Sequence, residues 1–224
     1  MNQNTNPSPL RGTPFEKGRN FNFFYQTNIF LPISLIMKFS IILAVDSKNW
    51  IWKDGTLAWK LSKDMRFFKE VTTSENKDGK LNAVIMWRKT RESIPEKFRP
   101  LSWRINCILT NSLRSSKTPT YENDKDKWAI SIICGSFGAC IKLLEKLDTV
   151  WNIFIIGWAN LYNSVLDNPF LERIYITKIE WDFGCDVFFN WIPNSFKPTI
   201  ISPNGTEWWI NFKFEVRDRN TTKG

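Results

Sequence analysis

The sequence has 224 residues, with 31 Lys and Arg against 22 Asp and Glu, and its formal net charge is +9. It contains no histidine, which excludes every mechanism that needs an imidazole side chain. A hydrophobic content of 42% excludes disorder throughout, and the positive charge favours an anionic partner such as a phosphorylated cofactor, an acidic substrate or nucleic acid.

The start of the chain differs in character from the rest. Residues 1–36 contain scattered Asn, Pro and Gly without a sustained hydrophobic period, so we expect a poorly structured N-terminal extension. Met37 directly precedes the first strong apolar run and is a candidate translation start, in which case residues 1–36 are not translated. We expect one folded domain over residues 37–219 and a short C-terminal tail over residues 220–224.

Continuous apolar runs predict buried strands at residues 38–45, 82–86, 105–109, 129–134 and 152–156. Helical segments alternate with them: a helix through residue 71 with Ser62 as its N-cap, a helix through residue 147 capped by Ser136, and a helix over residues 159–166. This alternation predicts an α/β fold with a single, mainly parallel twisted sheet and flanking helices. Residues 173–179 and 211–217 predict an antiparallel pair at the C-terminal edge of that sheet.

Four cysteines, at positions 107, 134, 140 and 185, are scattered along the chain without a C-x-x-C pair. Without histidine they make a poor metal site, so we expect no bound metal and reduced thiols in a cytoplasmic protein. The longest apolar stretch, residues 29–45, is broken by Pro32 and Lys38 and is too short for a membrane span. We expect neither a membrane anchor nor a signal peptide.

Three segments follow predicted strand ends, where ligands gather in parallel sheets. In the first, Asp64 lies early in a helix among apolar side chains, although a first-turn Asp also complements the helix dipole without any further role. In the second, Arg88, Lys89 and Thr90 open a helix and suit a phosphate group, although an isolated Arg-Lys pair is more often a solvated charged surface. In the third, Gly157 stands at a strand-to-helix turn where the backbone can approach a ligand.

Taken in order, six blocks of sequence resemble the dihydrofolate reductase family over residues 37–219. The chain reads N-W-I-W-K-D-G-T-L-A-W at residues 49–59 with Asp64 five residues later, V-I-M-W-R-K-T-R-E-S-I-P at 84–95, L-S-W-R-I-N at 101–106, I-G-W-A-N-L-Y at 156–162, Y-I-T-K-I at 175–179 and D-V-F-F-N at 186–190. Matching blocks in this order and at this spacing make chance an implausible explanation.

The resemblance implies a dihydrofolate reductase-like fold and the NADPH-dependent reduction of 7,8-dihydrofolate, with hydride transfer to C6 and protonation at N5. The implied catalytic residues are Asp64, which holds the pterin, Thr177, which hydrogen-bonds Asp64, and Trp59, which helps to hold a water. The implied substrate-binding residues are Ile42, Ala44, Met65, Phe68 and Arg104, of which Arg104 is the partner of the substrate's α-carboxylate. The implied NADPH-binding residues are Ala44, Ile51, Arg88, Lys89, Thr90, Ser112, Ile156, Gly157, Trp158 and Tyr162.

Tryptophan is frequent and glycine is rare in this chain, with 12 and 10 residues respectively. Six tryptophans stand where the family has glycine, namely Trp50, Trp52, Trp87, Trp103, Trp158 and Trp209. Adding six glycines to the 10 present would give 16 of 224 residues, about 7%, which is ordinary usage. We hypothesise that the source reads as glycine one codon that this sequence renders as tryptophan.

Three other functions compete with the one that the resemblance implies. A pyrimidine reductase of riboflavin synthesis would share the fold, but the spacing of Trp59, Asp64 and Arg104 favours folate. A non-catalytic homologue that has lost cofactor binding is the literal consequence of six bulky substitutions. A nucleic-acid-binding module ranks last, because the aromatic residues are not interleaved with Lys and Arg on one face. We therefore expect dihydrofolate and NADPH as small-molecule partners, no nucleic acid and a monomer.

Overall fold

The structure is a computed structural model that describes residues 37–74, 79–113, 120–157 and 159–220. The predicted N-terminal extension, Trp158 and the last four residues lie outside these ranges. The strands are β1 (Phe39–Val45), β2 (Trp50–Trp52), β3 (Leu81–Trp87), β4 (Arg104–Leu109), β5 (Thr120–Asp124), β6 (Ala129–Cys134), β7 (Val150–Ile155), β8 (Leu171–Ile179), β9 (Val187–Phe188), β10 (Phe196–Ile201), β11 (Gly205–Glu207) and β12 (Ile210–Arg219). The helices are α1 (Ser62–Thr73), α2 (Arg88–Ser93), α3 (Phe137–Leu144) and α4 (Ala159–Val165), with two short 3-10 helices, η1 (Glu96–Phe98) and η2 (Asn111–Leu113).

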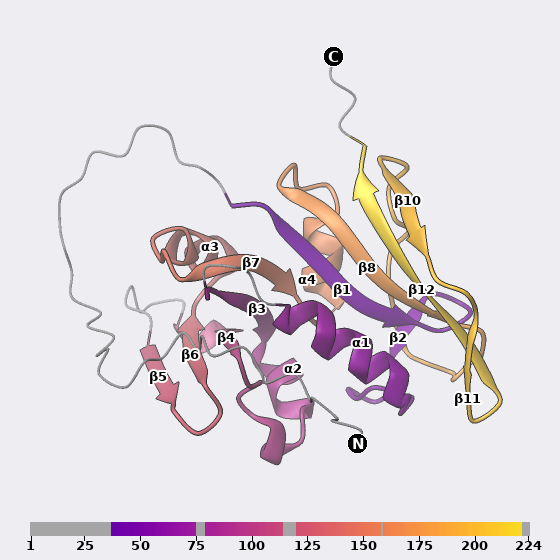
Figure 1. The fold of residues 1–224 in the computed structure, drawn as a ribbon, viewed down its shortest axis with the longest axis horizontal. Coiled ribbons are helices and arrows are strands. Elements are labelled where there is room, and N and C mark those ends of the chain that lie inside the picture. Colours follow the sequence, from indigo (N-terminus) through magenta and orange to yellow (C-terminus); the bar gives the residue numbers. More distant parts are fainter. Residues whose placement is uncertain (1–36, 75–78, 114–119, 158, 221–224) are drawn as a thin grey trace, which may run out of the picture.

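Ten of the strands form one sheet in the spatial order β10-β12-β8-β1-β7-β3-β4-β6-β5, with β11 paired to β12 (Figure 1). The six strands from β8 to β6 run parallel, whereas β10, β12 and β5 are antiparallel to their neighbours. The predicted fold class and the predicted antiparallel pair near the C-terminus are therefore confirmed. Strands β5 and β10 were not predicted, because both lie at sheet edges and neither carries a continuous apolar run.

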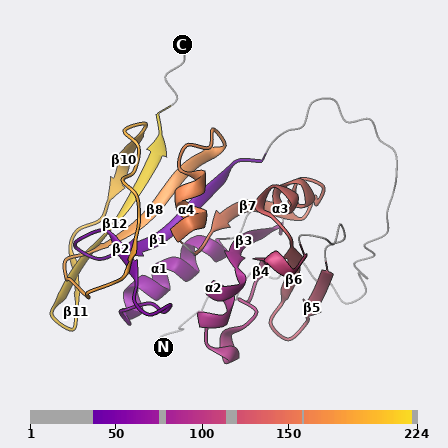
Figure 2. The ribbon, with the colours of Figure 1, turned by 180° about the vertical axis from the view of Figure 1, so that it is seen from behind.

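Successive residues of the central strands point to opposite faces of the sheet, so their side chains belong to separate apolar clusters. In β1, Ile41 and Leu43 join a cluster that includes side chains of α3 and α4, whereas Ile42 joins a cluster that includes Phe67 and Phe68 of α1. Helices α3 and α4 thus cover one face and α1 covers the other, as the two opposed views show (Figures 1 and 2). Burial on both faces explains why these strands are continuously apolar in sequence.

The two predicted helix caps have different outcomes. Ser136 caps α3 as predicted, since its Oγ accepts the N–H of Ala139 at 3.2 Å, although α3 ends three residues before the predicted residue 147. The prediction that Ser62 caps α1 is wrong. Leu61 is the N-cap residue, with extended backbone and no side-chain cap, and Ser62 is already helical. Glu207 takes over instead, because its carboxylate accepts the N–H of Ser62 at 2.7 Å and the N–H of Lys63 at 3.0 Å.

Tryptophan occupies four of the six non-glycine positions with positive φ among the described residues, namely Trp103, Trp128, Trp208 and Trp209. An L-residue in this conformation brings its Cβ against the following carbonyl, which costs about 1–2 kcal/mol that glycine avoids. Two of the six tryptophans in the codon hypothesis, Trp103 and Trp209, therefore lie where the backbone favours glycine. Trp128 and Trp208 share this conformation, although the sequence comparison with the family did not single them out.

Backbone conformation gives no such preference at three other positions of the hypothesis. Trp87 has a φ of −73°, and Trp50 and Trp52 lie in β2 without positive φ. Trp52 is also buried and joins the main apolar cluster. Trp158 lies outside the described residues, so the hypothesis is supported at some positions and stays a prediction at the others.

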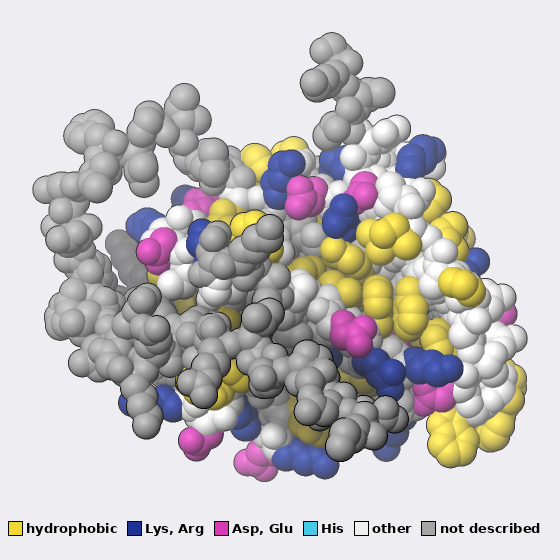
Figure 3. Space-filling view, viewed as in Figure 1, with side chains coloured by type: hydrophobic (Ala, Val, Ile, Leu, Met, Phe, Trp, Pro, Cys, Tyr) yellow, Lys and Arg dark blue, Asp and Glu magenta, His cyan; other side chains and the backbone are white. Residues whose placement is uncertain are grey.

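Trp208 and Trp209 form the two-residue loop of the β11–β12 hairpin, which is closed by the pairing of Glu207 with Ile210. Their φ values of 50° and 59° are typical of a type I′ turn, which favours Asn and Gly. Both indoles are largely exposed, at 69% and 77%. Hydrophobic side chains gather at this hairpin end, at the lower right of Figure 3. Packing therefore does little to offset the backbone strain.

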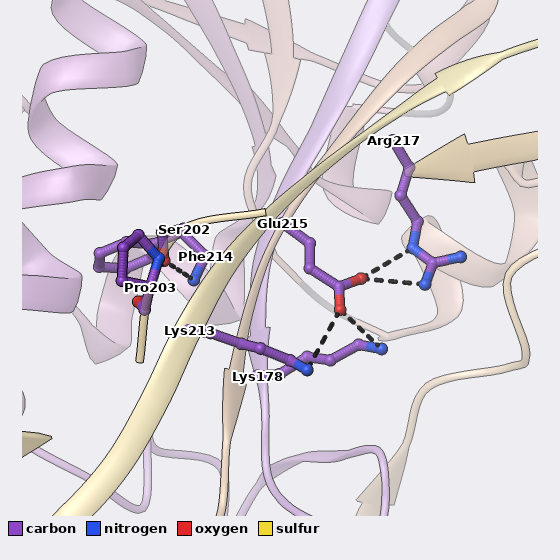
Figure 4. Close-up of polar contacts among 7 residues, drawn as sticks. All are labelled: Lys178, Ser202, Pro203, Lys213, Phe214, Glu215 and Arg217. Carbon is purple, nitrogen blue, oxygen red and sulfur yellow. Dashed lines mark hydrogen bonds and ion pairs between the residues drawn. The ribbon is translucent and has the colours of Figure 1, made fainter. Parts of the chain in front are cut away.

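Glu215 of β12 is a buried carboxylate held by three cations (Figure 4). Arg217 donates to its Oε2 through Nε at 3.0 Å and Nη2 at 2.9 Å, and the Nζ atoms of Lys178 and Lys213 lie 3.2 and 3.9 Å from its Oε1. Burial alone would raise the pKa of the Glu215 carboxyl, but the hydrogen bonds and charges of Arg217 and Lys178 outweigh burial and lower it. Because Lys178 belongs to β8, this carboxylate joins two neighbouring strands.

Three cysteines, Cys107 of β4, Cys134 of β6 and Cys140 of α3, are buried free thiols, and Cys185 is half-buried. In the described part of the chain, no helix is long and apolar enough to cross a membrane. Within the same ranges, no group of three or more Cys, Asp and Glu side chains could hold a metal ion.

Replacement of Trp209 by Gly should raise the free energy of unfolding by about 1 kcal/mol, because it relieves strain at positive φ and removes an exposed side chain. Urea denaturation of the variant and the unmodified chain measures this difference. Trp191→Gly is the matched control, since this indole is also exposed, at 76%, but has no positive φ. An equal or lower unfolding free energy for Trp209→Gly would contradict the interpretation.

Replacement of Glu215 by Gln should lower the free energy of unfolding at neutral pH by about 2 kcal/mol, because charge-assisted hydrogen bonds are lost. The folded-state pKa of Glu215 lies below its ordinary value of 4.5, so this stabilisation is complete above that value and disappears as the pH falls through the folded-state pKa. Thermal unfolding measured from neutral to acid pH should therefore show the two proteins converging at the acid end.

The control for Glu215 is Glu172→Gln, which removes an exposed ion pair with Lys38 at 3.3 Å and should cost less than about 1 kcal/mol. A difference between Glu215→Gln and the unmodified chain that stays constant down to acid pH would show that the charge of Glu215 is not what stabilises this part of the sheet.

Candidate functional site

A buried carboxyl group, Asp64, lies in the first turn of α1 and faces β8. Thr177 of β8 donates its hydroxyl hydrogen to Asp64 Oδ1 at 2.8 Å, and Trp59 Nε1 donates to Asp64 Oδ2 at 3.4 Å. The exposed fractions of Asp64, Trp59 and Thr177 are 7%, 3% and 1%. The structure thus brings together the three residues that the sequence singled out for catalysis, although Thr177 is 113 positions away from Asp64.

The protonation of Asp64 is set by this environment. Burial raises the pKa of the Asp64 carboxyl above its ordinary value of 3.8. The hydrogen bonds from Thr177 and Trp59 favour the carboxylate and oppose that rise, while the negative charge of Glu207 adds to it. The net result is a carboxyl group that holds a proton at higher pH than a solvated Asp does, which suits proton exchange with a ligand.

Apolar side chains surround this carboxyl group. Ile42 and Phe68 belong to one cluster on the α1 face of the sheet, and Ala44 packs against the cluster that contains Trp59. Met65 differs from the other predicted substrate-binding residues, because its side chain is 52% exposed and belongs to neither cluster. The site therefore has an apolar wall made by β1 and α1, and Met65 lies at its solvent side.

Arg104, at the start of β4, is a buried cation on the same face of the sheet. Its Nε donates to the carbonyl of Ser102 at 2.9 Å, its Nη1 donates to Thr72 Oγ1 at 2.7 Å, and its guanidinium lies 5.7 Å from the centre of the Phe68 ring. Burial lowers the pKa of Arg104 to about 10. Among the described residues no Asp or Glu forms an ion pair with it. A buried guanidinium without a counter-ion favours an anionic ligand.

An open cavity of about 490 Å³ lies beyond the carboxyl ends of β3 and β4. It is lined by Trp87, Arg88, Lys89, Thr110, Asn111, Ser112 and Asn160. Arg88, Lys89 and Ser112 are among the residues predicted to bind the cofactor, whereas the sequence analysis did not single out Thr110, Asn111 and Asn160. The missed residues directly follow β4 or lie in α4, so the rule that ligands bind at the carboxyl ends of parallel strands was a signal that could have found them.

Cationic side chains and hydroxyl groups line this cavity and can form hydrogen bonds with a ligand inside it. Arg88 forms an exposed pair with Glu92 at 3.4 Å, one turn along α2, which is a weak interaction that an anion can displace. Ser112 Oγ lies 2.9 Å from Thr110 Oγ1. These groups come from two adjacent strand ends and make the cavity suited to a phosphate-bearing ligand.

Thr90 and Gly157 meet where two parallel strands end. The hydroxyl oxygen of Thr90 is buried and has no hydrogen-bond partner in the described structure. Gly157 has a φ of +149°, and a Cβ at this position would lie 2.4 Å from Thr90 Cγ2 and 2.7 Å from Thr90 Oγ1. Glycine is therefore required at position 157, and the unpartnered hydroxyl beside it can serve a ligand oxygen.

Three other predicted cofactor-binding residues are packed into the fold. Ile51 and Ile156 are 2% and 8% exposed. Tyr162 is 4% exposed, and its hydroxyl donates to the carbonyl of Ile42 at 3.0 Å. Burial raises the pKa of the Tyr162 phenol, which stays a neutral donor. These buried side chains pack against β1 and the strand ends. Trp158, which the sequence also predicts to bind the cofactor, lies outside the described residues.

The loop before α1 is held by a segment from the C-terminal half of the chain. The N–H of Asp54 donates to Asp186 Oδ2 at 2.9 Å, and the N–H of Asp186 donates to the carbonyl of Trp52 at 2.7 Å. The N–H of Phe189 donates to the carbonyl of Asn49 at 3.0 Å, next to the pairing of β2 with β9. These contacts fix the course of the chain from β1 towards Trp59 and Asp64.

Comparisons with known proteins show which family this chain belongs to. The family model for dihydrofolate reductase matches residues 38–207. A dihydrofolate reductase of Drosophila melanogaster is 33% identical over 185 residues, which cover 81% of this chain and 97% of the relative. A putative dihydrofolate reductase of Caenorhabditis elegans is 35% identical over 156 residues, which cover 67% of this chain and 76% of the relative.

Longer plant proteins are also similar to this chain. A bifunctional dihydrofolate reductase-thymidylate synthase of Glycine max is 36% identical over 185 residues, which cover 81% of this chain and 32% of the relative. The chain thus spans about a third of the length of this bifunctional protein. Because the family model covers most of the folded part and the insect protein matches over nearly its whole length, the chain belongs to the dihydrofolate reductase family.

Proposed function

We propose that this chain catalyses the NADPH-dependent reduction of 7,8-dihydrofolate to 5,6,7,8-tetrahydrofolate. Membership of the family supports the reaction, and the observation that carries it is the buried Asp64 carboxyl held by Thr177 and Trp59. When bound, NADPH supplies the hydride for C6 of the pterin. Binding, orientation and the movement of the proton are the tasks of the chain's own side chains.

Asp64 is the proposed partner of the pterin ring. Its carboxyl group can form paired hydrogen bonds with the 2-amino group and N3 of the ring, and Thr177 keeps one of its oxygens in place. Trp59 donates its indole N–H to the other oxygen, and the resemblance implies that it also helps to hold a water. Burial raises the pKa of Asp64, which makes its carboxyl group a better partner for proton exchange with the ring and so favours protonation at N5.

Arg104 is the proposed partner of the α-carboxylate at the other end of dihydrofolate. Two of its nitrogens are held by Ser102 and Thr72, which fixes the plane of the guanidinium without neutralising its charge. A planar guanidinium with free donors matches a carboxylate in a bidentate manner. The apolar side chains of Ile42 and Phe68 would lie against the pterin and aminobenzoyl rings between the two polar ends.

The chain also fits the phosphates of NADPH. The cavity lined by Arg88, Lys89 and Ser112 can accommodate a phosphate-bearing group. Two adjacent cations favour NADPH over NADH, because NADPH carries an additional 2′-phosphate. The unpartnered hydroxyl of Thr90 and the bare backbone of Gly157 support close approach of the cofactor at the strand ends.

The direct test is the loss of NADPH absorbance that depends on dihydrofolate. It should be run on the complete chain and on the same chain with glycine at positions 50, 52, 87, 103, 158 and 209. Turnover in either protein supports the proposal. Two folded proteins that bind no dihydrofolate and show no turnover would overturn it in favour of the non-catalytic homologue.

Replacement of Asp64 by Asn should lower kcat at neutral pH by about a hundredfold or more, because the amide cannot take part in proton transfer. Steady-state kinetics measure kcat, and fluorescence titration should give an unchanged Kd for NADPH. Asp167→Asn, which changes an exposed Asp after α4, is the control and should leave both values unaltered. A kcat for Asp64→Asn within a few-fold of the unmodified chain would remove Asp64 from the mechanism.

Replacement of Arg104 by Gln should raise KM for dihydrofolate by about tenfold to a hundredfold, because a charge-assisted pair with the α-carboxylate is lost. Since Arg104 also supports Thr72 and Ser102, a matched substrate separates binding from structure. A dihydropterin that lacks the glutamate should be reduced with the same KM by both proteins. If KM rises equally for both substrates, Arg104 has a structural role and does not bind the carboxylate.

A further inference from the structure

The first turn of α1 lacks a cap from its own sequence. Leu61 at the N-cap position has no side-chain oxygen, and it is 1% exposed in the cluster with Trp59. Asp64 is the acid of the first turn, and such an acid ordinarily complements the free N–H groups of a helix N-terminus. Here both of its oxygens are engaged with Thr177 and Trp59. Asp64 is therefore directed towards β8 and Trp59 and away from the free N–H groups of α1.

Glu207 supplies the missing cap from a hairpin 145 positions further along the chain. One carboxylate oxygen accepts the N–H of Ser62 at 2.7 Å, and the other accepts the N–H of Lys63 at 3.0 Å. The Nζ of Lys63 donates in return to the carbonyl of Thr206 at 3.0 Å. Three hydrogen bonds thus join the turn that carries Asp64 to the end of β11.

The hairpin is anchored to the strand that carries the partner of Asp64. β11 pairs with β12, and β12 pairs with β8, where Phe214 lies opposite Thr177. A closed ring of contacts therefore runs from Asp64 through Thr177, β8, β12 and β11 to Glu207 and back to the first turn of α1. The distance between Asp64 and Thr177 depends on the Thr177 contact and on the Glu207 contact.

We propose that Glu207 is a positioning residue, which fixes the first turn of α1 so that the Asp64 carboxyl stays on Thr177 with the proton affinity that the reaction uses. Glu207 acts through the helix backbone, where it accepts two N–H groups, and through its charge. This inference rests on the proposed function only for its kinetic consequence, because the cap itself is a feature of the fold.

Two variants of the complete chain separate geometry from charge. Glu207→Gln keeps one acceptor oxygen and loses the charge, whereas Glu207→Ala loses the cap altogether. Because a nearby negative charge favours the protonated form of a carboxyl group, Glu207→Gln should lower the pKa of Asp64. Glu207→Ala loses the cap as well as the charge, so it should in addition lower kcat by about five- to tenfold, in proportion to a lost cap, without changing KM for NADPH.

The first readout does not require turnover. Carbon-13 NMR of carboxyl-labelled Asp gives the titration of Asp64, identified by the signal that Asp64→Asn removes. The second readout is the pH profile of kcat/KM, whose alkaline limb should move to lower pH together with the NMR titration. Glu172→Gln, which changes an exposed carboxylate in β8, is the control and should leave both readouts unchanged.

The outcomes distinguish this inference from the proposed function. An Asp64 titration that is unchanged in both Glu207 variants, while thermal unfolding shows that they are folded, would overturn the positioning role. A shifted titration in a protein without turnover of dihydrofolate would leave the positioning role standing and overturn the proposed function. A lower kcat in Glu207→Ala with an unshifted titration and an unshifted pH profile would show only a loss of stability, and would also overturn the inference.

Discussion

The site and the position of helix α1 both depend on the hydrogen bond between Thr177 and Asp64. A carboxyl group among apolar side chains must have partners for its oxygens, because a buried polar group without a partner is costly. Thr177 and Trp59 provide these partners at 2.8 and 3.4 Å. This arrangement fixes α1 against β8 and determines which face of the sheet can receive a ligand.

The parallel sheet explains why groups that are distant in sequence meet at the site. Each central strand enters its connection at the same edge, so the ends of β3 and β4 bring Arg88 and Ser112 to one cavity. The same geometry brings Thr90 against Gly157 so closely that no Cβ fits. The antiparallel strands have another task, since β12 and its hairpin support β8 and the start of α1 from the side.

How much could be predicted from the sequence depended on whether the signal was local. The central strands were predictable because burial on both faces leaves continuous apolar runs, as in β1 and β4. The cap of α1 was not, because Ser62 has the right side chain at nearly the right place, and the competing carboxylate of Glu207 belongs to a distant hairpin. Edge strand β10 was missed for a different reason: it is largely exposed and contains Pro198, so neither its composition nor its pattern indicates a strand.

The site residues also differ in whether a local sequence signal could reveal them. Asp64 could be singled out from its place in a helix among apolar residues, but its pairing with Thr177 came from the resemblance, because no pattern within the chain pairs two residues so far apart. The exposure of Met65 depends on how α1 is rotated against the sheet, which a list of apolar neighbours does not specify. The hydroxyl of Tyr162 is engaged by the carbonyl of Ile42, a backbone group that no sequence motif reveals.

The three buried thiols of β4, β6 and α3 allow the opening of the fold to be followed in time. The hydrogen bond with Cys140 and burial raise the pKa of the Cys134 thiol. The hydrogen bond with Cys107 and burial raise the pKa of the Cys140 thiol, and they outweigh its hydrogen bond with Cys134, which acts in the opposite direction. A thiol reacts with an alkylating reagent as the exposed thiolate, so these side chains must leave the core before they are modified. Cys185 is half-buried and needs a smaller movement. The slow part of the alkylation time course therefore measures how often β4, β6 and α3 separate, within a protein that carries its own less protected reference thiol.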